Sequence, residues 1–375
     1  MTDEQYMRRA IEIAKCGSGF TNPNPLVGAV IVKNDKIIGE GYHAKYGELH
    51  AERNAFASLK ESAEGATIYV TLEPCCHYGK TPPCTSAIIE NKISRVVIGS
   101  RDSNPKVSGK GAAILRKEGI TVEEDFLREE CDELNDVFFH YITSKTPYVV
   151  AKYAMTADGK IATKTGASKW ISTEKSRQYV AKMRGKYMGI MVGIGTVLAD
   201  NPMLNARIEG ARNPIRIICD SRLRIPLDCK ICNTAKEIRT IVVCNIGEDK
   251  FSQEKMKEKL QKQQMLQDKG VEIINLYKKY EDVIDLKLLM ERLGELGIDS
   301  ILLEGGGTLN YSALKAGIVQ QLNVFVAPKI FGGVDAKTAV EGIGVNEPDE
   351  AVKMHIKKIQ TIDEDLLIEY SIENN

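Results

Sequence analysis

The chain has 375 residues, enough for two ordinary domains, and it carries 51 basic and 51 acidic side chains. A net charge of zero lacks the basic surplus that is typical of nucleic-acid binders. No apolar run reaches the length of a membrane span, and Asp3 and Glu4 stand where a signal peptide would be basic, so we expect a cytoplasmic protein.

The first 145 residues predict an α/β/α layered domain. Thr2 and Gln5 suit a capping box at the start of a first helix, and 26–32 with 36–41 indicates a hairpin. Beyond the hairpin, strands are predicted at 67–71 and 95–99, and helices near 51–59, 85–91 and 111–118. An acidic helix with a solvated face is predicted over 123–134.

The most specific motif in the chain follows the hairpin. His50-Ala51-Glu52 precedes the run Pro74-Cys75-Cys76-His77-Tyr78-Gly79-Lys80-Thr81-Pro82-Pro83-Cys84. His50, Cys75 and Cys84 are suitable ligands for a catalytic zinc ion whose fourth position is left for water. Zinc lowers the pKa of that water, and Glu52 is placed to carry protons from it to a departing amine. The motif therefore predicts deaminase chemistry.

The spacing departs from the usual zinc-deaminase pattern P-C-x-x-C, because position 78 is Tyr and the next cysteine after Cys76 is Cys84. Residues 77–83 must therefore loop out. A closed structural zinc site is the alternative, with Cys76 or His77 as the fourth ligand, but such a site has no use for Glu52. We otherwise interpret Cys76 as a packing residue. Disulfides are not expected, because the chain has an odd number of cysteines, nine.

A second α/β domain is predicted for residues 146–375. Its segment Gly305-Gly306-Gly307-Thr308 follows an apolar strand and precedes a helix, which lets the backbone approach a phosphate. Residues 193–196 and 221–222 also end strands and are candidate walls of the same cleft. Cys229 and Cys232 have redox spacing without a thioredoxin-like setting, so we interpret them as an incidental pair. Strands are predicted at 148–153, 188–192, 215–220, 240–243, 271–274, 300–304 and 321–328, and an exposed helix at 254–269.

Several motifs, in order along the whole chain, resemble those of one family. In the first half they are T-N-P-N-P-L-V-G-A-V at 21–30, G-Y-H at 41–43, P-C-C-H-Y-G-K-T-P-P-C at 74–84 and R-D-S-N-P at 101–105. In the second half they are A-D-G-K-I-A at 157–162, S-K-W-I-S at 168–172, V-G-I-G-T-V-L-A-D-N-P at 192–202 and L-E-G-G-G-T at 303–308. The chain resembles the bifunctional riboflavin-biosynthesis enzymes, in which a diaminohydroxyphosphoribosylaminopyrimidine deaminase is joined to a 5-amino-6-(5-phosphoribosylamino)uracil reductase. The resemblance implies a cytidine-deaminase-like α/β/α domain followed by a dihydrofolate-reductase-like α/β domain that binds NADPH.

The resemblance also implies roles for individual residues. In the first domain, the substrate would contact Asn24, His43, His77, Lys80, Asp102 and Asn104. In the second domain, it would contact Lys152, Ser168, Arg184, Leu204, Arg207 and Glu304. The cofactor would contact Ala154, Trp170, Thr196, Asp200, Ser221, Gly305, Gly306, Gly307 and Thr308. Lys152 and Asp200 are candidates to assist ribosyl ring opening or proton transfer. Without the resemblance, we would interpret an arginine in the second domain as part of a surface ion pair and Trp170 as a residue of the core.

The activity implied is bifunctional. The first domain would replace the 2-amino group of 2,5-diamino-6-(ribosylamino)-4(3H)-pyrimidinone 5′-phosphate with oxygen. The second would use NADPH to reduce the ribosylamino group, giving 5-amino-6-ribitylaminouracil 5′-phosphate. The partner would be this small phosphorylated pyrimidine, with no nucleic acid and no membrane, and a homo-oligomer is expected because deaminases of this fold commonly associate. The alternatives are a tRNA or nucleoside deaminase, which predicts P-C-x-x-C spacing and a basic face, and a zinc-stabilised binding module, for which Glu52 has no role.

Overall fold

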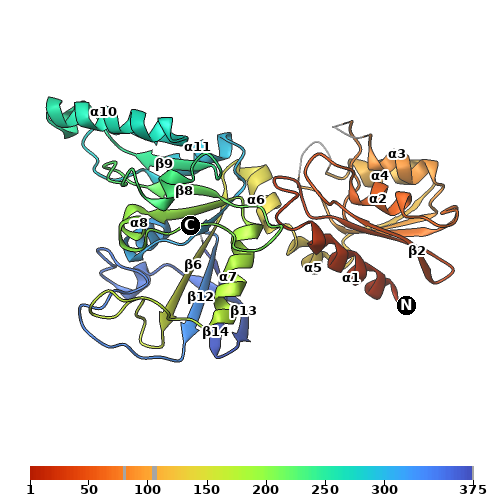
Figure 1. The fold of residues 1–375 in the computed structure, drawn as a ribbon. Helices are drawn as coiled ribbons and strands as arrows, with labels where there is room; N and C mark the ends of the chain where they lie inside the picture. Colours follow the sequence, from red (N-terminus) through yellow and green to blue (C-terminus); the bar gives the residue numbers. More distant parts are fainter. Residues whose placement is uncertain (79–81, 104–107, 374–375) are drawn as a thin grey trace. The chain divides into compact units, whose positions relative to one another are not determined.

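The structure, a computed structural model, describes residues 1–78, 82–103 and 108–373. The chain divides into two compact units, Met1–Lys145 and Thr146–Asn375 (Figure 1). Each unit has its own β-sheet and its own hydrophobic core. Each therefore has the interior that an independent folding unit requires.

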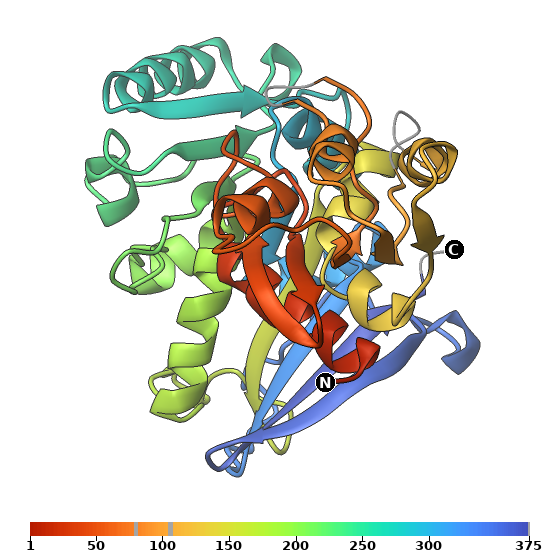
Figure 2. The same cartoon turned by 90° about the vertical axis from the view of Figure 1, so that its right-hand side faces the viewer.

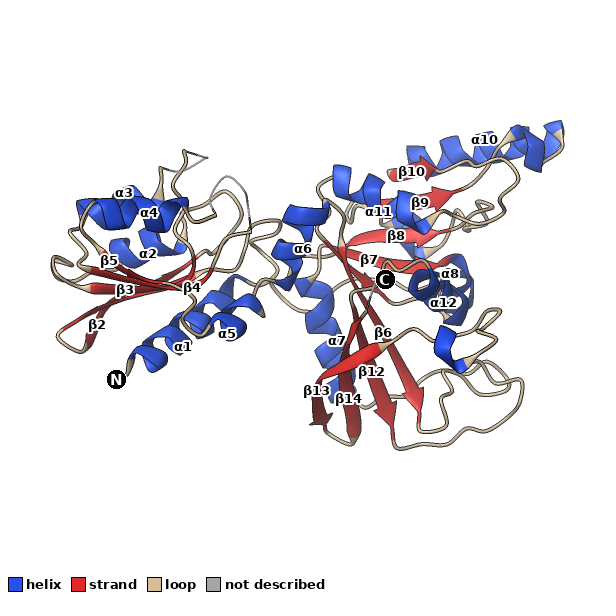
Figure 3. Cartoon of the chain, turned by 180° about the vertical axis from the view of Figure 1, so that it is seen from behind, coloured by secondary structure: helices blue, strands red, loops and turns tan. Residues whose placement is uncertain are grey.

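The first unit is built on a five-stranded sheet in the order β2-β1-β3-β4-β5. β1 (Gly28–Lys33) is antiparallel to β2 (Lys36–Tyr42) and β3 (Thr67–Leu72), whereas β3, β4 (Arg95–Ser100) and β5 (Thr121–Glu123) are parallel. Helices α2 (Ala51–Ala57), α3 (Cys84–Glu90) and α4 (Lys110–Lys117) cover one face, and α1 (Asp3–Ala14) and α5 (Arg128–Asp132) cover the other (Figure 3). The predicted α/β/α layering is confirmed.

Burial on both faces explains the sequence of this sheet. Val30 and Ile31 are neighbours in β1 and point to opposite faces, yet both are fully buried because helices cover both sides. The predicted capping box is present: the Thr2 hydroxyl accepts from the Gln5 N–H, and the Gln5 side chain accepts from the Thr2 N–H. The parallel strands β3 and β4 end at the same edge of the sheet, where open α/β sheets place their ligands.

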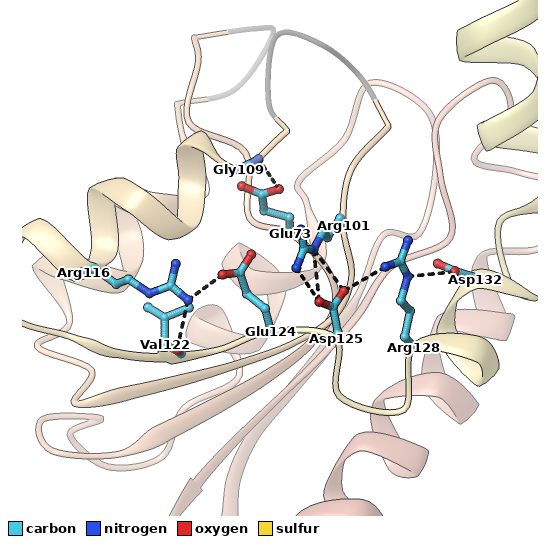
Figure 4. Close-up of polar contacts among 9 residues, drawn as sticks. All are labelled: Glu73, Arg101, Gly109, Arg116, Val122, Glu124, Asp125, Arg128 and Asp132. Carbon is cyan, nitrogen blue, oxygen red and sulfur yellow. Dashed lines mark hydrogen bonds and ion pairs between the residues drawn. The ribbon is translucent and has the colours of Figure 1, made fainter.

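The helix predicted over 123–134 is confirmed only over the five residues of α5, Arg128–Asp132. That stretch contains the end of β5, a turn and the five-residue α5. Asp125 and Leu127 have φ of 62° and 51°, in the left-handed region that a right-handed helix excludes. Glu124 and Asp125 precede this helix: Arg101 donates to both oxygens of Asp125, and Glu124 accepts from Arg116 (Figure 4). The acidic residues before Arg128 therefore form a turn that pairs with arginines distant in the sequence.

The second unit contains a nine-stranded sheet in the order β10-β9-β8-β7-β11-β6-β12-β14-β13. Its strands are β6 (Tyr148–Thr156), β7 (Gly189–Gly193), β8 (Ile215–Cys219), β9 (Thr240–Cys244), β10 (Val271–Asn275), β11 (Ser300–Leu303), β12 (Gln321–Ala327), β13 (Met354–Ile362) and β14 (Asp365–Ile372). All neighbours from β10 to β12 are parallel, and β14 is antiparallel to both β12 and β13. Figure 2 shows this blue C-terminal hairpin along one edge. The predicted dihydrofolate-reductase-like α/β fold is confirmed, but the hairpin was not predicted.

Helices cover both faces of this sheet. One core cluster joins the sheet to α11 and α12, and a second joins it to α8, α9 and α10. The helices of the chain not yet given are α6 (Asp136–Ser144), α7 (Glu174–Lys186), α8 (Ile194–Asp200), α9 (Lys230–Asn233), α10 (Gln253–Asp268), α11 (Leu286–Glu295) and α12 (Gly307–Lys315), with 3₁₀ turns at 15–17, 248–250 and 348–350. Within the described residues, no helix combines the length and apolarity needed to span a bilayer.

Candidate active sites

Three elements of the first unit bring the predicted zinc ligands together. His50 is the residue before α2, Cys84 begins α3, and Cys75 lies on the segment that follows β3. The Nδ1 atom of His50 lies 3.4 Å from the Sγ of Cys75 and 3.4 Å from the Sγ of Cys84. All three ligand atoms lie within 4.8 Å of one another.

These separations fit a zinc ion. With Zn–S near 2.3 Å and Zn–N near 2.0 Å, tetrahedral coordination separates a nitrogen from a sulfur ligand by about 3.5 Å. The hydrogen bond from Cys84 lowers the pKa of Cys75 to about 4, and the same contact and burial raise the pKa of Cys84. A metal ion bound here would displace the protons that Cys84 and His50, whose pKa values are raised, otherwise hold.

The cluster has three ligands rather than four. Among the described residues, His50, Cys75 and Cys84 are the group that could hold a metal, and neither Cys76 nor His77 belongs to it. The side chain of His77 is exposed. Three protein ligands leave one coordination position open, which is the arrangement of a catalytic rather than a structural zinc site.

Glu52 lies in the first turn of α2, beside this cluster, and is only 3% exposed. Burial, followed by the nearby Cys75 thiolate, raises the pKa of its carboxyl group. The carboxyl group also hydrogen-bonds the Cys84 side chain. A carboxyl group with a raised pKa holds its proton to higher pH, which suits a group that must both take and give one.

His43 packs against the His50 ring edge to face, with 5.5 Å between the ring centroids. Burial lowers its pKa, so the ring is neutral. Its Nδ1 lies 3.0 Å from the carbonyl oxygen of Leu49, which can only accept, so Nδ1 carries the proton. Nε2 is then the acceptor for the Asn24 amide at 3.2 Å. The donor and acceptor roles of both side chains are thereby fixed next to the cluster.

The other residues predicted to contact the substrate in this unit are less closely grouped. Asp102 is buried at the carboxyl end of β4, the same sheet edge from which Cys75 extends. His77 lies beside the ligands in sequence but is exposed. Lys80 and Asn104 lie outside the described residues.

Two further side chains that fix this site were not predicted. Asn135 binds the backbone of Leu26 with both amide atoms, at 2.8 and 2.9 Å, and so holds the segment that carries Asn24. Glu73, two residues before Cys75, is buried and accepts hydrogen bonds from backbone N–H groups at the start of α4. The only sequence signal for Glu73 was an acidic residue at the end of an apolar strand; Asn135 had none.

The second unit contains a pocket of about 830 Å³. Every residue predicted for this unit lines it: Lys152, Ala154, Ser168, Trp170, Arg184, Thr196, Asp200, Leu204, Arg207, Ser221, Glu304, Gly305, Gly306, Gly307 and Thr308. They come from the ends of β6, β7, β8 and β11 and from the helices and loops that follow. The cleft expected from strand ends is therefore a single cavity.

A buried charge cluster forms one wall of this pocket. Arg184 donates from Nε and Nη2 to the two carboxylate oxygens of Glu304, at 2.6 and 2.9 Å, and Lys152 Nζ lies 3.8 Å from the same carboxylate. Burial alone would raise the pKa of Glu304, but Arg184 and Lys152 lower it to about 2. Burial lowers the pKa of Lys152 and, with repulsion from Arg184, that of Arg207. One carboxylate faces three cations, which favours an anionic ligand.

The glycine-rich segment lies at the start of α12. Gly306 precedes the helix, and a Cβ there would meet nothing nearer than the Thr196 hydroxyl at 3.9 Å. A Cβ on Gly307 would instead lie 2.5 Å from Cγ of Glu341. Gly306 therefore leaves space on the pocket side, whereas Gly307 allows the C-terminal loop to pack closely.

Trp170 is not a core residue. It is 57% exposed and lines the pocket, with the guanidinium of Arg177 4.5 Å from its ring centroid. The core-packing interpretation of this residue is therefore wrong. An exposed aromatic face in a pocket wall is suited to stacking on a planar ring.

Comparison with known proteins places this arrangement in a family. The family model described as the RibD C-terminal domain matches residues 147–368, and that of the cytidine and deoxycytidylate deaminase zinc-binding region matches residues 1–100. The chain is 54% identical to the riboflavin biosynthesis protein RibD of Actinobacillus pleuropneumoniae over 372 residues, which cover 99% of this chain and 96% of that protein. The chain belongs to the RibD family.

Other members match from end to end. Identity to the riboflavin biosynthesis protein RibD of Escherichia coli is 36%, covering 98% of this chain and 99% of that protein. The crystal structure of a diaminohydroxyphosphoribosylaminopyrimidine deaminase/5-amino-6-(5-phosphoribosylamino)uracil reductase from Thermotoga maritima superimposes with a TM-score of 0.85 at 38% identity, covering 99% of this chain and 98% of that one. The family inferred from the motifs is confirmed over both units.

Proposed function

We propose that the chain is a bifunctional enzyme of riboflavin biosynthesis, with the deaminase in residues 1–145 and the reductase in residues 146–375. The observation that carries this proposal is the open three-ligand cluster with a buried acid beside it, in a chain that matches deaminase–reductase relatives over its whole length. The substrate is 2,5-diamino-6-(ribosylamino)-4(3H)-pyrimidinone 5′-phosphate, and the final product is 5-amino-6-ribitylaminouracil 5′-phosphate.

In the first unit, zinc bound by His50, Cys75 and Cys84 would supply a polarised water near neutral pH. Glu52 would take a proton from the attacking water and pass it to the departing amine, a role for which its raised pKa is suited. Asn24, His43 and Asp102 would orient the pyrimidine, and we assign His77, Lys80 and Asn104 to the same substrate on the resemblance.

In the second unit, NADPH would supply the hydride that reduces the ribosyl carbon. The loop 305–308, with Ala154, Trp170, Thr196, Asp200 and Ser221, would hold the cofactor. Ser168, Arg184, Leu204, Arg207 and Glu304 would hold the substrate. Lys152, whose pKa burial lowers, would deliver a proton to the ribosyl ring oxygen as the ring opens, with Asp200 assisting.

The test uses the zinc-replete protein, the pyrimidinone and NADPH. We expect ammonia to be released first. The absorbance of the reduced nicotinamide of NADPH should fall only when the deaminated intermediate is present. Absence of ammonia would exclude the deaminase. Ammonia without NADPH oxidation would leave a monofunctional enzyme, and zinc binding with neither reaction would indicate a binding module.

We also propose a homo-oligomer in the cytoplasm, without nucleic-acid or membrane partners. The edge strand β13 supports the oligomer, because Met354, Ile356 and Ile359 are 41%, 60% and 55% exposed along it. Light scattering should give a mass above one chain of 41.5 kDa. A monomer at micromolar concentration would contradict this proposal.

A further inference from the structure

Glu73 stands two residues before the ligand Cys75 and is 4% exposed. Its carboxylate accepts hydrogen bonds from three backbone N–H groups at the start of α4, those of Gly109 and Gly111 at 2.9 Å and that of Ala112 at 3.3 Å. The first N–H groups of a helix have no partner within the helix, and a carboxylate there makes charge-assisted bonds. Figure 4 shows Glu73 reaching Gly109.

Gly111 brings α4 onto the same piece of chain. A Cβ at this position would lie 2.3 Å from the carbonyl oxygen of Pro74 and 3.2 Å from Oε1 of Glu73. No real side chain tolerates the first of these contacts, so glycine is what permits the close approach. The first turn of α4 therefore fixes the segment that leads into Cys75, by hydrogen bonds to Glu73 and by contact with Pro74.

The other side of Cys75 is fixed by α3. The Thr85 N–H donates to the Cys75 carbonyl at 3.2 Å, and the Cys84 N–H lies 3.4 Å from the Cys75 sulfur. Glu73 thus anchors the chain on the N-terminal side of Cys75. On the C-terminal side the anchor is α3, the helix that begins with another ligand, Cys84. Between these two anchors, the Cys75 sulfur stands 3.4 Å from His50 Nδ1.

We propose that Glu73 is a positioning residue for the zinc site, which binds no metal itself but holds Cys75 at the tetrahedral distance from His50 and Cys84. The inference rests on the zinc site of the proposed function and concerns metal binding alone. Partners that orient metal ligands typically change metal affinity by about 10- to 100-fold when they are removed. We expect a change on that scale here.

The test replaces Glu73 by Gln in the full chain. The amide would present an N–H₂ donor to backbone donors, so the anchor weakens while the side-chain volume stays the same. Competition with a chromophoric chelator, without substrate, should show a zinc Kd raised about 10- to 100-fold. The matched control is Glu124→Gln, the same chemical change in a side chain that binds Arg116 on α4 (Figure 4). Its zinc Kd should stay within about twofold of the parent value, because Arg116 lies at the opposite end of α4 from the N–H groups that Glu73 binds.

A second control separates positioning from stability. Leu115→Ala opens a cavity in the buried face of α4 and keeps the Glu73 carboxylate, so it should lower Tm and leave the zinc Kd unchanged. An unchanged zinc Kd in Glu73→Gln would overturn the proposal. It would also be overturned if Leu115→Ala, at the same fall in Tm, lost as much zinc affinity as Glu73→Gln. Should Glu73→Gln not fold, Gly111→Ala, which keeps the carboxylate but displaces α4 from Pro74, must show the weakened Kd. A normal Kd in Gly111→Ala would then overturn it.

These outcomes are independent of the proposed reaction. A parent protein that binds zinc but releases no ammonia would remove the deaminase and leave the role of Glu73 open to the same measurement. Normal ammonia release together with an unchanged Kd in Glu73→Gln would remove the positioning role alone.

Discussion

Arg184 and Glu304, 120 positions apart in the chain, form a bidentate ion pair in the wall of the pocket of the second unit, with N···O distances of 2.6 and 2.9 Å. Both side chains are largely buried, at 14% and 12% exposure, and Lys152 shares the carboxylate at 3.8 Å. One anion therefore balances two buried cations. Removal of one member of such a cluster leaves charge without compensation.

Glu304→Gln should abolish the reductase while sparing the deaminase. Without the carboxylate, Arg184 and Lys152 repel each other and lose their relative placement. We expect the kcat/KM for NADPH oxidation to fall at least about 100-fold, the scale of misplaced catalytic groups. Ammonia release by the same sample is the internal control. Equal loss of both activities would point to general misfolding instead.

The same carboxylate makes stability depend on pH. Its pKa is lowered from 4.5 to about 2 in the folded protein, so its contribution is complete above pH 4.5 and is lost as the pH falls toward 2. At about 1.4 kcal/mol for each pH unit, that contribution is about 3 kcal/mol. Urea unfolding followed by the fluorescence of Trp170, the only tryptophan, reports on the second unit. Between pH 5 and 2, the free energy of unfolding of the second unit should fall more steeply in the parent than in Glu304→Gln. Equal falls in the two proteins would contradict the lowered pKa of Glu304.

Gly306→Ala should weaken cofactor binding without loss of stability. The methyl group would meet only the Thr196 hydroxyl at 3.9 Å in the protein itself, but it would occupy the space beside the N-terminus of α12. We expect the KM for NADPH to rise about tenfold, as for loss of one good polar contact, with Tm unchanged. Gly307→Ala is the contrasting variant, because its methyl group would meet the Thr338 carbonyl at 2.8 Å and should lower Tm. A normal KM in Gly306→Ala would exclude close cofactor approach there.

Glu52→Gln should leave zinc bound and stop deamination. The amide fills the same buried volume but cannot move a proton, and general acid–base groups contribute typically about 10²- to 10⁴-fold. Metal content by atomic absorption should stay near one zinc per chain, and the reductase should retain full activity on the deaminated intermediate. Deamination at the parent rate would remove Glu52 from the reaction.

Local motifs were readable from the sequence because their chemistry sits within short segments. His50 and Glu52 are two residues apart at the start of α2, so this one helix start places both side chains at the ligand cluster. The apolar strands of both sheets follow from runs of β-branched residues that are buried on both faces. Cys84 was grouped with His50 and Cys75 because the spacing to Cys75 requires a loop, and the structure brings the three ligand atoms together.

Long-range contacts were not readable in this way. The turn at Asp125 pairs with the distant Arg101, and nothing in the acidic stretch itself marks it. The β13–β14 hairpin escaped prediction because β13 is exposed over most of its length, so it lacks the alternating pattern of a half-buried strand. Arg184 and Glu304 were grouped by family resemblance, since residues so far apart carry no local signal of their contact.

The protonation of the ligand cluster has a consequence for how the first unit would acquire its metal. The pKa of Cys75 is lowered while those of Cys84 and His50 are raised, so uptake of zinc must displace protons that Cys84 and His50 hold. Loading should consequently acidify a weakly buffered solution and become less favourable in acid.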